Sequence, residues 1–148
     1  MKIEYMQLAL EEAKKAAQED EVPIGCVIVD PKTDTVIVKT HNASEKVNCL
    51  KHAELLAIEK ATEKLNSNRL WGMDLYVTLE PCTMCAAGIS FARIANLYFG
   101  AFDQKGGAVV NGVKFFASPT CHHHPNIEGG IMEPECSQIL KDFFKTKR

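Results

Sequence analysis

The chain has 148 residues, of which 46% are hydrophobic and 24% are charged, and this balance fits one globular domain spanning residues 1–148. No apolar run approaches the ~20 residues needed to cross a bilayer, and the N-terminus lacks the apolar core and cleavage site of a secretory signal, so we expect a cytoplasmic protein with no membrane partner. The formal net charge of −2 is unlike that of the strongly basic domains that often bind nucleic acids.

The first half of the chain is expected to form a helix, a hairpin and a second helix. Residues 3–18 repeat apolar side chains at helical spacing. Residues 24–30 form an apolar, β-branched run typical of a buried strand, and 35–40 read as its return strand after a proline-containing turn. The polar segment 41–51 is expected to be a loop, followed by a helix over 52–65.

The second half alternates strands and helices. A strand is predicted over 74–79, a helix over 82–93 with Pro81 at its start, and a strand over 94–100. A last helix is predicted over 134–145, and two loops over 103–112 and 118–126. Strands that alternate with helices indicate an α/β fold with a sheet covered on both faces.

Four residues in two separate motifs suggest a metal site. His52 and Glu54 stand in "HAE", and Cys82 and Cys85 stand in "EPCTMC". Zinc binds imidazole and thiolate, and a site with three protein ligands keeps its fourth position for water, whose pKa it lowers. We expect His52 at a helix boundary, where it and Glu54 could both face the ion, with Glu54 as the proton carrier.

Each motif alone allows other readings. The C-x-x-C pair could be a redox pair or half of a four-cysteine structural site, although the chain has no second C-x-x-C. "HAE" alone is most simply part of a surface helix. Together they match the H-x-E…P-C-x-x-C signature of zinc-dependent nucleobase deaminases. With six cysteines and no export signal, a reducing compartment is expected.

The C-terminal segment "KDFFKTKR" combines basic and aromatic side chains. Such a segment could contact a single-stranded nucleic acid. It could equally be a helix end whose cations face the helix dipole.

The sequence resembles the cytidine deaminase superfamily and, within it, the bacterial tRNA adenosine deaminase family, over nearly its whole length. The segments that carry the resemblance are "EVPIGCVIV" (21–29), "HN" (41–42), "KHAELLAI" (51–58), "LYVTLEPCTMCAAGI" (75–89), "ARIANLYFGAFDQKGGA" (92–108) and "DFFKTKR" (142–148). The zinc motif specifies the superfamily, whereas "FGAFDQKGGA" and the terminal "DFF" favour the tRNA enzymes.

The resemblance implies a three-layer α/β/α sandwich with a central mixed, mostly five-stranded sheet. It implies one Zn²⁺ per subunit, held by His52, Cys82 and Cys85, with Glu54 as general acid and base. The implied reaction is hydrolytic deamination of adenosine to inosine at the wobble position of a tRNA anticodon, with an arginine tRNA as the expected substrate. A deaminase of a free base or nucleoside (cytosine, guanine or cytidine) would use the same zinc site and is the alternative.

The resemblance also implies substrate contacts. Asn42 would touch the purine, the backbone N–H of Ala53 would contact the base, and the backbone carbonyl of Glu80 would accept from the amine. Positions near the anticodon loop are matched by Asp103, His123, Asp142 and Phe144. Family members build the RNA site across a homodimer interface, which would bring together Lys141, Lys145, Lys147 and Arg148.

Overall fold

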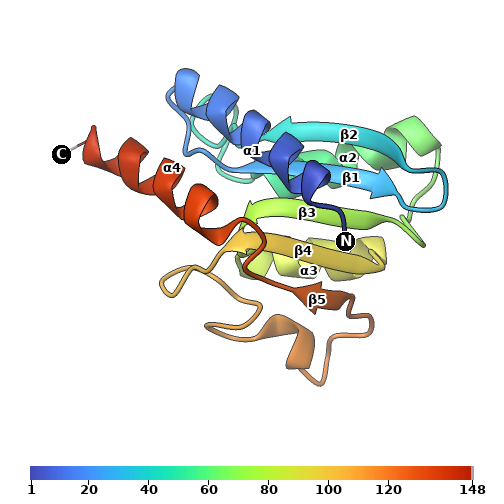
Figure 1. Cartoon of the computed structure of the whole chain (residues 1–148). Helices are drawn as coiled ribbons and strands as arrows, with labels where there is room; N and C mark the ends of the chain where they lie inside the picture. Colours follow the sequence, from blue (N-terminus) through green and yellow to red (C-terminus); the bar gives the residue numbers. More distant parts are fainter. Residues whose placement is uncertain (148) are drawn as a thin grey trace.

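A five-stranded mixed sheet separates two layers of helices (Figure 1). The computed structural model describes residues 1–147, so Arg148 lies outside the described residues. The strands are β1 (Gly25–Asp30), β2 (Thr35–His41), β3 (Asp74–Leu79), β4 (Asn96–Ala101) and β5 (Asn126–Glu128). Their order across the sheet is β2-β1-β3-β4-β5. β1 pairs antiparallel with β2 and β3, whereas β3, β4 and β5 run parallel.

The helices cover the two faces of the sheet in pairs. α1 (Ile3–Gln18) and α4 (Glu133–Lys145) lie on one face, and α2 (Ala53–Leu65) and α3 (Thr83–Ala92) lie on the other (Figure 1). A short 3₁₀ helix, η1 (Phe115–Ala117), packs against α3. The three-layer α/β/α sandwich predicted from the sequence is therefore confirmed.

Side chains along the central strands point alternately to the two faces of the sheet, and each face has its own hydrophobic core. On β1, Cys26 and Ile28 pack toward α2 and α3, whereas Val27 and Val29 pack toward α1 and α4. Because successive side chains of a strand point to opposite faces, a strand buried on both faces must be apolar throughout. This explains why the continuous apolar run of β1 lies inside the sheet.

Two local expectations from the sequence need correction. The segment 118–126 was expected to be a loop, but Asn126 is the first residue of β5, which pairs with β4 at the sheet edge. The third helix begins at Thr83, so Pro81 precedes the helix and Cys82 is its N-cap. Among residues 1–147, the structure contains no helix with the length and apolar character needed to cross a membrane.

Candidate metal centre

The beginnings of α2 and α3 bring together the three predicted metal ligands. His52 is the N-cap of α2, Cys82 is the N-cap of α3, and Cys85 lies in the first turn of α3. The Nδ1 atom of His52 lies 3.6 Å from Cys82 Sγ and 3.5 Å from Cys85 Sγ. All three ligand atoms lie within 4.8 Å of one another. The convergence follows from the packing of α2 against α3 on one face of the sheet.

The chemistry of this donor set fits Zn²⁺. Hydrogen bonds from the Cys85 thiol and from His52 lower the pKa of Cys82 to about 4, so the thiolate is its favoured form. The hydrogen bond with Cys82 and burial raise the pKa of Cys85, and a bound cation would reverse that preference because it stabilises both thiolates. One imidazole and two thiolates are typical zinc ligands, and three protein ligands leave one coordination position for a small molecule.

Glu54 provides a buried carboxyl beside these ligands. It is the second residue of α2 and is only 4% exposed. Burial raises the pKa of Glu54 to about 7, although a hydrogen bond from its own backbone N–H opposes this effect. A carboxyl with a pKa near neutrality can both accept and donate a proton at physiological pH. The arrangement is the one expected from "HAE", with His52 at the helix boundary and Glu54 just inside.

A hydrogen-bonded loop holds Asn42 after the end of β2. The Asn42 Nδ2 donates to Ser44 Oγ at 3.1 Å and to Glu21 Oε1 at 3.4 Å. Glu21 is 1% exposed and also accepts the backbone N–H groups of Glu45 (3.0 Å) and Lys46 (2.6 Å). The orientation of the Asn42 amide is therefore fixed by a buried carboxylate that the sequence did not single out.

Ala53 is the first residue of α2 and is fully buried. Its N–H is one of the helix-terminal amides that have no partner inside the helix, so it can serve a ligand. Its carbonyl accepts a hydrogen bond of 2.7 Å from Thr40 Oγ1, which ties this end of α2 to β2.

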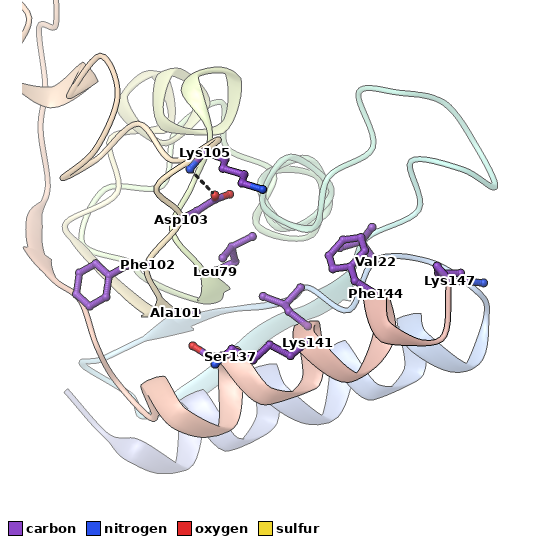
Figure 2. A pocket seen from close by; sticks show the side chains of 11 residues that line it. Val22, Leu79, Ala101, Phe102, Asp103, Lys105, Ser137, Lys141, Phe144 and Lys147 are labelled. Carbon is purple, nitrogen blue, oxygen red and sulfur yellow. Dashed lines mark hydrogen bonds between the residues drawn. The ribbon is translucent and has the colours of Figure 1, made fainter.

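Asp103 and Phe144 line a pocket of about 710 Å³ between the end of β4 and α4 (Figure 2). Phe144 is 47% exposed. The Asp103 Oδ1 accepts the backbone N–H groups of Lys105 (3.1 Å) and Gly106 (2.9 Å), which orders its own turn. The other lining residues are Val22, Leu79, Ala101, Phe102, Lys105, Ser137, Leu140, Lys141 and Lys147. The three metal ligands are not among them.

Asp142 and His123 are neither candidate metal ligands nor among the residues that line this pocket. Asp142 is exposed, and its Oδ1 accepts a hydrogen bond of 2.8 Å from Gln138 Nε2. The Nε2 of His123 lies 2.8 Å from the carbonyl oxygen of Ile94, and its ring meets Trp71 edge-on at 5.7 Å. These contacts are beyond the C-terminal end of α3, whereas the candidate metal ligands Cys82 and Cys85 are at its N-terminal end. Within one chain, the structure does not bring His123 to the metal centre.

Comparison with known proteins agrees with this geometry. The model of the MafB19-like deaminase family matches residues 1–148. The tRNA-specific adenosine deaminase of Agrobacterium fabrum is 54% identical over 145 residues, covering 97% of this chain and 94% of the relative. The protein of the same name from Bacillus subtilis is 40% identical over 145 residues, covering 97% of this chain and 89% of the relative.

Solved structures share the fold. A structure from a study of A-to-I editing by tRNA:A34 deaminases superposes with a TM-score of 0.91 and 52% identity, covering 94% of this chain and 100% of that chain. Guanine deaminase from Nitrosomonas europaea superposes with a TM-score of 0.84 and 16% identity, covering 97% of this chain and 84% of that chain. This similarity shows a shared fold alone. The present chain thus belongs to the MafB19-like deaminase family and, within it, to the tRNA-specific adenosine deaminases.

Proposed function

We propose that this protein, as one deaminase domain over residues 1–148, converts adenosine to inosine at the wobble position of a tRNA anticodon in the cytoplasm. An arginine tRNA is the proposed substrate. The observation that carries the proposal is the buried Glu54 beside the His52, Cys82 and Cys85 cluster in a chain 54% identical to a tRNA-specific adenosine deaminase.

Glu54 is the group proposed to move protons during the reaction. His52, Cys82 and Cys85 would hold Zn²⁺, which when bound makes hydroxide available at neutral pH. The net reaction adds water at C6 of adenine and releases ammonia. Glu54 would accept the first proton released by water and deliver it to N1. It would then take the proton of the new C6 hydroxyl, as that group becomes the carbonyl, and pass it to the departing amine. Its pKa of about 7 suits a group that must work in both directions.

Backbone and amide groups around Glu54 are proposed to orient the base. Asn42 would contact the purine, with its amide held by Glu21 and Ser44. The N–H of Ala53 would donate to the base, and the backbone carbonyl of Glu80 would accept from the amine that leaves. Because the target base must leave its stack to reach a buried carboxyl, the substrate is expected to be a loop rather than a duplex.

The pocket beside α4 is proposed to receive the rest of the anticodon loop. Phe144 offers an exposed ring for base stacking, and Lys141 and Lys105 add positive charge around it. Lys147 also lines this pocket and forms an ion pair with Asp20.

A homodimer is proposed to complete the RNA site. His123 and Asp142 lie away from the metal centre of their own chain. In a homodimer they could instead contact an anticodon loop that is bound at the metal centre of the other subunit.

The proposal is tested by an inosine assay. Zinc-loaded protein is incubated with an anticodon stem-loop that carries adenosine at the wobble position, and in parallel with free adenosine, cytidine, cytosine and guanine. Inosine in the stem-loop alone is the expected result. Ammonia released only from a free base or nucleoside would keep the deaminase chemistry and refute the tRNA substrate.

A further inference from the structure

The side chain of Glu80 forms a buried acceptor for five hydrogen bonds. Glu80 is only 2% exposed. Its Oε1 accepts from the backbone N–H of Asp103 at 3.0 Å and from Asn111 Nδ2 at 2.8 Å. Its Oε2 accepts the backbone N–H groups of Val109 (3.0 Å), Val110 (3.0 Å) and Asn111 (3.1 Å). A buried carboxylate is costly without such partners, so this arrangement is specific to a charged acceptor.

The donors all belong to the loop that follows β4. Two backbone hydrogen bonds also hold this part of the chain, from the Glu80 N–H to the carbonyl of Ala101 at the end of β4 (2.9 Å) and from the Ala108 N–H in the loop to the Pro81 carbonyl (2.8 Å). Cys82, a metal-ligand candidate, comes directly after Pro81. The segment that positions Cys82 and the loop 103–111 are therefore linked by side-chain and backbone contacts.

Gly107 makes the close approach of the loop to Glu80 possible. A Cβ atom at this position would lie 2.5 Å from Glu80 Cδ, 2.6 Å from Glu80 Oε2 and 2.5 Å from the Asp103 carbonyl oxygen. Real Cβ contacts are essentially never shorter than 3.0 Å, so any larger residue would displace the loop from the carboxylate.

We propose that Glu80, through its side chain, is a positioning residue for the RNA substrate. Its carboxylate fixes the loop 103–111 against the segment that carries Cys82, and so sets where Asp103 and Lys105 stand in the pocket that Phe144 also lines. This role rests on the proposed function, and it is separate from the contact proposed for the Glu80 backbone carbonyl.

The substitution Glu80→Gln tests this role with little change of shape. An amide has one oxygen and an NH₂ group that cannot accept. At least two of the five donors therefore lose their acceptor. We expect kcat/KM for the stem-loop to fall about 10- to 100-fold, mainly through KM, because a small misplacement of binding groups has effects of this size. Zinc content should be unchanged, and amide hydrogen exchange in 103–111 should become faster.

Two further variants separate positioning from general stability. Gly107→Ala leaves Glu80 intact but pushes the loop away, so it should reproduce the defect in KM and the faster exchange. Leu75→Val shortens a fully buried side chain on β3, in the core facing α2 and α3. It should lower the Tm while leaving kcat, KM and exchange in 103–111 near the wild-type values.

The outcomes decide between the alternatives. The proposal is overturned if Glu80→Gln keeps kcat/KM within about twofold, if its loop exchanges like wild type, or if it loses zinc. It is also overturned if Leu75→Val shows the same KM defect at a matched decrease in Tm. If the wild-type protein deaminates a free base and not the stem-loop, the proposed function fails, and with it the role of Glu80 in placing RNA. Faster exchange in 103–111 of Glu80→Gln would in that case still show that the carboxylate holds this loop.

Discussion

Replacing Glu54 by glutamine should remove turnover while leaving the metal site in place. The side chain is 4% exposed, and glutamine has nearly the same volume, so the substitution opens no cavity. General acid–base catalysis typically contributes 10²- to 10⁴-fold. Because one carboxyl is proposed to carry every proton, we expect a loss near the upper end, about 10⁴-fold in kcat, or about 5.4 kcal/mol of transition-state stabilisation.

The pattern of kinetic constants is part of this prediction. Glu54 is not one of the three clustered ligands, so zinc content should stay at one ion per chain. A group that acts only in the transition state should lower kcat and kcat/KM equally, with KM little changed. Initial rates of inosine formation in the stem-loop and elemental analysis of the same sample measure both quantities.

Glu59→Gln is the matched control. Glu59 lies on the same helix, is exposed, and forms an ion pair of 3.1 Å with Lys51, and such surface pairs contribute about 0–1 kcal/mol. This variant should retain wild-type kinetics. A fall of less than about tenfold in kcat for Glu54→Gln, or loss of zinc from it, would show that Glu54 is not the proton carrier.

Three other predictions concern RNA binding, the metal and pH. Phe144→Ala should weaken stem-loop binding about 5- to 150-fold, the value of one base–aromatic stack, with zinc retained; unchanged affinity in a binding titration would argue against stacking. Chelation should lower the Tm, and added Zn²⁺ should restore it, whereas His52→Ala should not respond to Zn²⁺. The third prediction concerns Glu12. Burial raises the pKa of its carboxyl, but hydrogen bonds from Lys15 and His41 outweigh burial and lower that pKa below 4.5. Its contribution to stability is therefore present above about pH 4.5 and lost as pH falls through the folded value. Glu12→Gln should lower the Tm more at about pH 7 than at about pH 3, and equal effects at both would contradict this.

Much of the secondary structure could be predicted because it depends on short-range patterns. The predicted bounds of α1 and β3 agree with the structure, and those of β1 and β2 differ by one residue at one end. β5 was missed because it is a three-residue, exposed strand at the sheet edge. Such a strand has no apolar alternation to reveal it, and it pairs with β4, which is distant in sequence.

The candidate metal ligands could be identified from the sequence for a similar reason. Cys82 and Cys85 lie within one turn, and His52 and Glu54 are two residues apart, so each half of the site is a local motif with a known chemical preference. What sequence spacing could not provide is the contact between the two halves. That contact depends on α2 and α3 lying together on one face of the sheet, with their N-termini adjacent.

The sequence by itself predicted the order of the helices and of the first four strands, and it singled out the His52, Cys82 and Cys85 set that the structure brings together, since these depend on residue type and local spacing. Only the tertiary structure decided what Glu21 and Glu80 do. Both are buried carboxylates that accept backbone N–H groups from loops 23 to 31 residues away in sequence. A backbone donor is the same for almost every residue type, so no sequence pattern marks the loop that a buried carboxylate will hold.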